Sequence, residues 1–228
     1  RGNIHLTKVD AEYPDNKLTG ATFEVYKDSN GSGKLDDGDE LLGTLTEKEI
    51  GSYEMKDLFY GRYFVKETKA PEGFVLDTGV YEVMIDTDGK TCEVENKAGV
   101  GFINEAMRGN LKIVKTSSDG KIKGFAFRIT GANGYDIILE TNDKGEIVIE
   151  GIRIGDYTVS EVSNSASAMY VLPADKKATV KTGSTTIVEM HNVLRDTPKT
   201  GDATNLPLLY ALAGLSAVGI AVTAFVGF

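Results

Sequence analysis

The sequence is short of cysteine, tryptophan and histidine, and each shortage narrows what the protein can be. Cys92 is the single cysteine among 228 residues, so no disulfide can form within the chain. Tryptophan is absent, and the two histidines, His5 and His191, are isolated, which favours neither a metal site nor nucleophilic catalysis. A secreted protein built from small domains would therefore need a covalent staple other than a disulfide.

Basic residues are also in the minority, because 25 lysines and arginines face 34 aspartates and glutamates, for a net charge of −9. Such a chain repels the phosphates of nucleic acid, so no nucleic-acid partner is expected. Only five prolines accompany 26 glycines, which predicts many turns between short strands. Residues 1–4 do not begin a signal peptide, whereas the C-terminal end is apolar. We therefore expect the sequence to be a segment of a longer protein.

An internal repeat divides most of the chain into two units. Four blocks recur in the same order, pairing residues 2–8 with 109–115, 17–23 with 121–127, 61–67 with 155–161, and 102–104 with 190–192. We predict two homologous domains, residues 1–107 and 108–194. The second is shorter, mainly because it lacks the stretch rich in Asp and Gly around residues 28–40.

Apolar residues within each unit alternate with polar ones, as in Tyr81, Val83 and Ile85. This period of two predicts an all-β fold, in which each unit is an Ig-like antiparallel sandwich of about seven strands without the Cys–Trp–Cys framework. Residues 206–228 carry no charge and are predicted to form a hydrophobic helix long enough to span a membrane.

Six polar residues, three in each unit, stand at strand positions that alternate in step with the apolar residues and therefore face the core. They are Lys8, Glu67 and Asn104 in the first, and Lys115, Glu161 and Asn192 in the second. Lysine and glutamate are almost never fully buried without partners. One explanation for their predicted burial is that these side chains pair with one another noncovalently inside an uncrosslinked sandwich. Lys112 is a rival nucleophile in the second unit, although its parity faces solvent.

Chemistry between the buried groups is the other explanation. Burial drives lysine towards its neutral, nucleophilic amine and glutamate towards its neutral acid, which can polarise the amide carbonyl of asparagine. The product is a Lys–Asn isopeptide bond, with ammonia as the leaving group. Because this reaction turns over once on the chain itself and requires no cofactor, we expect no enzyme activity towards a separate substrate.

Residues 63–74 reinforce this interpretation. Their sequence, Tyr-Phe-Val-Lys-Glu-Thr-Lys-Ala-Pro-Glu-Gly-Phe, is similar to the E-box (Y-x-V-x-E-T-x-A-P-x-G-Y/F) of Cna B-type, or SpaA-like, domains of Gram-positive pili and adhesins. The resemblance implies a prealbumin-like sandwich and two isopeptide bonds, Lys8–Asn104 assisted by Glu67 and Lys115–Asn192 assisted by Glu161. The second unit keeps residues 157–161 of the motif but lacks the Ala-Pro-x-Gly part.

An acidic stretch, residues 28–39, fits the twelve-position calcium-loop pattern. The predicted ligands are the side chains of Asp28, Asn30, Ser32, Asp36 and Asp39 and the carbonyl group of Lys34. The twelfth position is Asp rather than Glu, and the flanking residues are predicted strands rather than helices. These departures favour a solvated acidic hairpin loop over a weak structural calcium site.

A sorting signal is predicted near the C-terminus. Thr197, Pro198, Lys199, Thr200 and Gly201, in a linker over residues 195–205, resemble the L-P-x-T-G motif of sortase substrates. The resemblance implies cleavage after Thr200 and attachment to the peptidoglycan cross-bridge, hence a secreted protein anchored to a Gram-positive cell wall. Thr197 stands where the motif has Leu, and no basic tail follows the apolar run. A plain transmembrane anchor is the alternative.

The expected function is a structural stalk of a wall-anchored adhesin or pilin-like protein. Its expected partners are sortase and peptidoglycan, with host extracellular matrix or other pilus subunits reached through regions outside this sequence. One alternative is a module that itself binds host matrix or glycan. Another is a spacer in a wall-anchored enzyme whose catalytic domain lies upstream.

Overall fold

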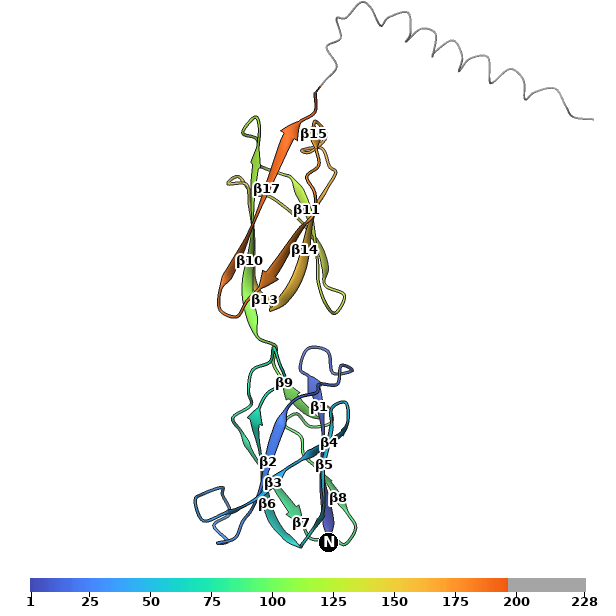
Figure 1. The fold of residues 1–228 in the computed structure, drawn as a ribbon, viewed down its shortest axis with the longest axis vertical. Coiled ribbons are helices and arrows are strands. Elements are labelled where there is room, and N and C mark those ends of the chain that lie inside the picture. Colours follow the sequence, from blue (N-terminus) through green and yellow to red (C-terminus); the bar gives the residue numbers. More distant parts are fainter. Residues whose placement is uncertain (197–228) are drawn as a thin grey trace, which may run out of the picture.

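The computed structural model describes residues 1–196, and all of the regular secondary structure in this span is β-strand. Figure 1 shows two sandwiches stacked end to end along the long axis of the molecule. Each sandwich has its own hydrophobic core. The predicted all-β class and the two sandwiches are therefore confirmed. No helix within residues 1–196 is long and apolar enough to cross a membrane, and the predicted helix at 206–228 lies outside the described residues.

The first sandwich contains nine strands in two facing sheets. One sheet has the order β4-β5-β1-β8, with β9 also paired to β1, and the other has the order β3-β2-β6-β7. The strands are β1 (Gly2–Asp10), β2 (Thr22–Lys27), β3 (Glu40–Thr44), β4 (Thr46–Glu49), β5 (Ser52–Leu58), β6 (Gly61–Lys69), β7 (Val80–Ile85), β8 (Thr91–Glu93) and β9 (Phe102–Asn104).

The second sandwich repeats this arrangement with eight strands. Its sheets have the orders β13-β10-β17-β15 and β12-β11-β14-β16. The strands are β10 (Arg108–Ser117), β11 (Ala126–Thr130), β12 (Asp136–Glu140), β13 (Glu146–Arg153), β14 (Gly155–Val162), β15 (Tyr170–Val171), β16 (Lys176–Val180) and β17 (Thr185–Leu194). In both sandwiches the first strand lies beside the last and runs parallel to it.

Strand number exceeds the predicted seven in both units, and the last strand of the first unit explains part of the difference. There the chain breaks into β8 and β9, separated by a loop in which Gly99 and Gly101 have φ angles of +71° and +126°. Residues with side chains rarely adopt such angles, so these glycines permit the break. In the second unit β17 is continuous and pairs with β10 from Asn110 to Ser117.

The core of each sandwich follows from the alternation seen in the sequence. Along β1 the buried positions are every second residue, beginning with Gly2 and continuing through Ile4 and Leu6. Facing side chains from the other sheet complete the core, and Phe23 packs edge-on against Phe102 at a centroid distance of 4.9 Å. The row of inward positions on β1 then continues into polar residues, which places them at one end of the core.

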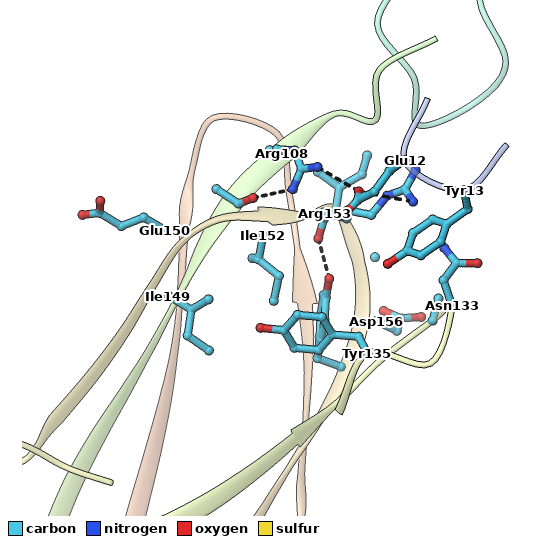
Figure 2. A pocket seen from close by; sticks show the side chains of 15 residues that line it. Glu12, Tyr13, Arg108, Asn133, Tyr135, Ile149, Glu150, Ile152, Arg153 and Asp156 are labelled. Carbon is cyan, nitrogen blue, oxygen red and sulfur yellow. Dashed lines mark hydrogen bonds and ion pairs between the residues drawn. The ribbon is translucent and has the colours of Figure 1, made fainter. Parts of the chain in front are cut away.

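The two sandwiches meet at a charged junction (Figure 2). Arg153 of the second sandwich donates from Nη2 to Oδ2 of Asp10 in the first, at 2.6 Å. Its guanidinium carbon also lies 5.1 Å from the ring centre of Tyr13. Arg108 contacts Glu12 at 2.8 Å, so both arginines hold the turn that follows β1. The junction therefore anchors the end of the first strand to the second sandwich.

Candidate functional site

The first candidate site joins three strands of the first sandwich. Lys8 lies on β1, Asn104 lies on the neighbouring β9, and Glu67 lies on β6 of the opposite sheet. Inward parity and the packing of the two sheets bury all three, with exposures of 0%, 2% and 0%. The fold thus brings together the three residues that the sequence predicts for this unit.

Hydrogen bonds orient these three side chains. Asn104 donates from Nδ2 to Oε2 of Glu67 at 2.9 Å, across the core. Lys8 Nζ donates to the carbonyl oxygen of Phe102 at 3.0 Å. Oδ1 of Asn104 and Oε1 of Glu67 are buried without a hydrogen-bond partner among the described residues, which is rare in folded proteins. The free amide oxygen is the atom that a protonated Glu67 would polarise.

Burial changes the pKa values of both ionisable groups. Desolvation lowers the pKa of Lys8 to about 8, although the nearby charges of Glu67 and Asp77 oppose the change. Desolvation likewise raises the pKa of Glu67, against the hydrogen bonds from the Asp77 N–H and from Asn104. Both shifts favour the neutral amine and the neutral acid, the pair of protonation states that amide exchange requires.

The second sandwich holds an equivalent set. Lys115 lies on β10, Asn192 on β17 and Glu161 on β14, with exposures of 2%, 0% and 8%. Asn192 donates from Nδ2 to Oε1 of Glu161 at 2.7 Å. Lys115 Nζ lies 4.2 Å from the ring centre of Phe125 and donates to the carbonyl of Thr116. Asn192 Oδ1 and Glu161 Oε2 are again buried without partners.

The electrostatics of this second set run in the same direction. Desolvation lowers the pKa of Lys115 and raises the pKa of Glu161. Lys112, the rival nucleophile, points to the other face of β10 and forms an ion pair with Glu146 at 2.7 Å. Lys115, which is buried on the core face of β10 beside the strand that carries Asn192, is therefore the better-placed nucleophile.

Strand register places the two sets in the same geometry. On the parallel pair β1–β9, Lys8 is the partner of Phe102, two residues before Asn104. On β10–β17, Lys115 is the partner of Met190, two residues before Asn192. Each glutamate pairs with a phenylalanine of the adjacent strand, Phe23 for Glu67 and Phe127 for Glu161. The two domains therefore place lysine, glutamate and asparagine at equivalent positions of their sheets.

The acidic loop, residues 28–39, closes on itself between β2 and β3. Asp28 accepts from the Gly33 N–H at 3.2 Å and pairs with Arg62 at 3.3 Å. Asn30 donates to Asp36 at 2.7 Å. The remaining predicted ligands are also engaged within the loop: the Ser32 hydroxyl donates to the Lys34 carbonyl, and Asp39 accepts from the Ser29 and Asp36 N–H groups.

The first of the predicted ligands contacts a positively charged side chain of the same domain. The side chain of Asp28 is 3% exposed and its Oδ1 has no partner, but its other oxygen faces a guanidinium. Across residues 1–196, no group of three or more His, Cys, Asp or Glu side chains is placed to hold a metal ion. The strands β2 and β3 on either side form a hairpin, as the sequence predicts.

The predicted sorting motif, Thr197 to Gly201, lies outside the described residues, which end at residue 196. The last described strand, β17, ends at Leu194, so the chain leaves the second sandwich directly after the strand that carries Asn192.

Sequence reasoning missed two features around the first site. The main-chain N–H of Asp77 donates to Glu67 Oε2 at 2.8 Å. Asp10, two residues after Lys8, is 2% exposed and bonds to Arg153 of the other sandwich. Asp77 lies in a loop, where strand parity carries no information, so no periodic signal could reveal it. The inward parity of Asp10 could have been noticed, since it extends the row that ends in Lys8.

Comparison with known proteins identifies several that are similar to this chain. The trypsin-resistant surface T6 protein of Streptococcus pyogenes is 25% identical over 194 residues, covering 72% of this chain and 34% of that protein. The structure of the Bacillus anthracis TIE protein, 23% identical, covers 85% of this chain and 34% of that one with a TM-score of 0.60. The minor pilin of Streptococcus agalactiae is 18% identical over 89% of this chain and 100% of its own, with a TM-score of 0.41.

The chain thus spans about a third of the length of the first two of these proteins. The SpaA family, described as a prealbumin-like fold domain, matches residues 2–98 and again residues 109–194. Each matched span falls within one of the two sandwiches. The chain belongs to the SpaA prealbumin-like domain family and contains two of its domains in tandem.

Proposed function

We propose that this chain is a stalk segment of a Gram-positive surface protein, an adhesin or pilin-like molecule, whose two sandwiches each crosslink themselves through a Lys–Asn isopeptide bond. The observation that carries the proposal is the buried set of lysine, glutamate and asparagine, present in the same register in both sandwiches. Membership of the SpaA family and the likeness to a streptococcal surface protein support the stalk role.

The reaction in the first sandwich balances within the chain. The lone pair of the neutral Lys8 amine attacks Cγ of Asn104, while the neutral acid of Glu67 polarises the amide oxygen. A proton passes from Nζ by way of Glu67 to Nδ2, the Cγ–Nδ2 bond breaks, and ammonia leaves. Glu67 ends as it began, so the net change is one new amide bond and the loss of one ammonia.

The fold supplies the catalytic power of this step. Two parallel neighbouring strands hold amine and amide in one core, and such fixed proximity corresponds to effective molarities of up to ~10⁵–10⁸ M. The surrounding core excludes water, which shifts both groups towards their neutral forms and keeps water away from the product. The same reasoning applies to Lys115, Glu161 and Asn192 in the second sandwich.

Attachment to the cell wall is the second part of the proposal. The motif Thr197-Pro198-Lys199-Thr200-Gly201 followed by an uncharged run suits a sortase, which would join Thr200 to a peptidoglycan cross-bridge. The chain would then be held at the wall by the end of the second sandwich. Incubation with sortase and a cross-bridge peptide tests this: a covalent product ending at Thr200 is expected, and an intact chain would contradict the assignment.

Intact mass under denaturing, reducing conditions tests the crosslinks. Residues 1–196 are suitable because they contain both sandwiches whole, each with its own core. We expect a mass short of the calculated value by two molecules of ammonia. The calculated mass itself would refute the mechanism, and a deficit of one would leave a single reactive sandwich, identified by which lysine peptide stays unmodified after digestion.

Variants assign each ammonia to its sandwich. Glu67→Ala is expected to reduce the mass deficit by one ammonia, because the first sandwich no longer crosslinks, and Glu161→Ala is expected to do the same for the second sandwich. Glu72→Ala is a matched control, because Glu72 is exposed and lies five positions after Glu67. It should retain the full deficit.

A further inference from the structure

The strand that presents Asn104 is unusually short. β9 has three residues and is separated from β8 by residues 94–101, so it lacks the long ladder that holds its counterpart β17. β17 pairs with β10 over the whole stretch from residue 185 to residue 192. A three-residue strand fixes an attacked amide poorly by ladder bonds alone. Something else must hold β9 in register beside Lys8.

The side chain of Asn96 supplies that support. Its Oδ1 accepts from the Ile103 N–H at 2.6 Å, and its Nδ2 donates to the Ile103 carbonyl at 2.9 Å. Asn96 thus binds the main chain of the residue between Phe102, whose carbonyl accepts from Lys8, and Asn104, whose amide is attacked. In effect it adds a side chain where a neighbouring strand would otherwise lie.

The same Asn96 amide is tied to the loop before β7. Its Nδ2 also donates to Oδ2 of Asp77 at 2.7 Å. Tyr81 donates its hydroxyl to the same oxygen at 2.9 Å, and Gly79 N–H donates to the other oxygen at 2.6 Å. Held in this way, Asp77 directs its own N–H at Oε2 of Glu67.

We propose that Asp77 and Asn96 form a positioning clamp for the crosslinking reaction of the first sandwich: through one side-chain hydrogen bond they fix the proton-transferring Glu67 and the strand that carries Asn104 relative to each other. This inference rests on the proposed isopeptide reaction. It concerns residues that touch neither the Lys8 amine nor the amide carbon, so they are positioning residues rather than catalytic ones.

The second sandwich provides a natural comparison. There Glu161 accepts from Asn192 but receives no main-chain N–H from any of residues 1–196, and Asn192 lies in an uninterrupted ladder. The clamp is therefore found in the sandwich whose last strand is broken into β8 and β9, and the described part of the other sandwich, with its continuous β17, shows no equivalent. A pocket of about 320 Å³ lies beside the clamp and is lined by Asp77, Tyr81 and Asn104 among others.

Kinetics of crosslinking test the clamp. Residues 1–196 are purified from inclusion bodies in denaturant, which keeps the groups apart, and dilution starts folding and reaction together. Samples are stopped with acid, digested, and the two linked peptide pairs are quantified by mass. We expect Asn96→Ala and Asp77→Ala to slow the Lys8–Asn104 bond by about 10- to 100-fold, the effect of a misplacement near 1 Å. The Lys115–Asn192 bond in the same molecules should form at the wild-type rate.

A pH profile separates positioning from a general loss of stability. The charged and titratable groups around Glu67 are Lys8 on β1, Asp77 in the loop and Tyr81 on β7, and Asp10 on β1 lies near Lys8. The hydrogen bond from the Asp77 N–H lowers the pKa of Glu67. Asn96→Ala keeps all these charges but frees Asp77, so this hydrogen bond is weakened and the pKa of Glu67 rises. The acid limb of the first reaction should therefore move to higher pH. A variant that is only less stable would keep the limb in place.

The outcomes distinguish the two levels of the argument. Failure of both bonds in the wild-type chain would refute the proposed function. Formation of the first bond at the wild-type rate in both variants, with the pH limb unmoved, would overturn the clamp alone. If either variant fails to fold, Tyr81→Phe removes a single hydroxyl group and should slow the first bond measurably, while an unchanged rate would count against the clamp. Lys97→Ala, an exposed neighbour of Asn96, is the matched control.

Discussion

Glu67→Gln should lower the thermal stability of the first sandwich far more than a change of one atom in a core would suggest. The substitution keeps the size of the side chain and an acceptor for Asn104, but it removes the acid that the proposed reaction needs. The variant should therefore fold without the Lys8–Asn104 bond. The cost is that of opening a covalent loop over residues 8–104.

The magnitude follows from the length of that loop. Chain-entropy reasoning developed for disulfides gives about 4.7 kcal/mol for a closed loop of this size. For a domain of about 100 residues, each kcal/mol changes the melting temperature by roughly 4–8 °C. The first sandwich should thus melt roughly 19–38 °C lower in the variant. The corresponding loop of the second sandwich, residues 115–192, is shorter and gives about 4.5 kcal/mol.

Differential scanning calorimetry on residues 1–196 measures both sandwiches at once, so the second transition serves as an internal control. Asn104→Ala should produce the same large decrease, since it removes the electrophile. In that uncrosslinked background, adding Glu67→Gln should change the melting temperature by only a few degrees, because there is no bond left to lose.

Two results would refute this reasoning. If Glu67→Gln retained the loss of both ammonia molecules, the glutamate would not be needed for the bond. If the variant lacked one bond yet melted at the wild-type temperature, closure of the loop would contribute nothing, and the noncovalent core alone would account for the stability.

Three further outcomes follow from the structure. The rate of the first crosslink should be bell-shaped in pH, because the reactive pair of neutral amine and neutral acid holds one proton in total. The rate should fall above about pH 8, the pKa of Lys8, where the pair loses that proton, and at an acid limb above the usual pKa of glutamate, where it gains a second one. A flat profile would contradict the mechanism. Arg153→Ala should free the angle between the sandwiches by removing the ion pair with the buried Asp10, seen as a changed small-angle scattering curve, whereas an unchanged curve would place the rigidity elsewhere. Millimolar calcium should give no binding heat, because Asp28 is already paired with an arginine, and saturable heat would contradict this.

Alternation in the sequence was enough to predict the fold class, the two sandwiches and the burial of the polar row. Strand parity is a local property with a period of two, so Lys8 and Lys115 could be assigned to the core from their neighbours alone. The internal repeat then linked each lysine to a glutamate and an asparagine far away in the chain, because the same order occurs twice.

The loops and the junction could not be predicted in this way. Asn96 meets Asp77 across 19 positions, in loops where no period relates one residue to another. Arg153 meets Asp10 across 143 positions, and although both residues end strands, alternation within a strand does not say which residue of another domain lies opposite. The break between β8 and β9 was missed for a related reason. Gly99 and Gly101 permit a turn, but glycines are so frequent in this chain that two more do not identify a broken strand.

The placement of the proposed bonds explains how such a stalk would carry tension. In each sandwich the first and last strands are parallel neighbours, so pulling on the two ends of the chain shears them past each other. A Lys8–Asn104 bond transfers the load directly between those strands, and β10 then passes it to Lys115 and Asn192. Residues 9–103 and 116–191 would lie outside the covalent path and could not unravel under load. Single-molecule stretching should therefore show no lengthening from either sandwich, whereas Glu67→Gln should release the length of the first sandwich alone; lengthening in the unaltered chain would mean that the load does not run through these bonds.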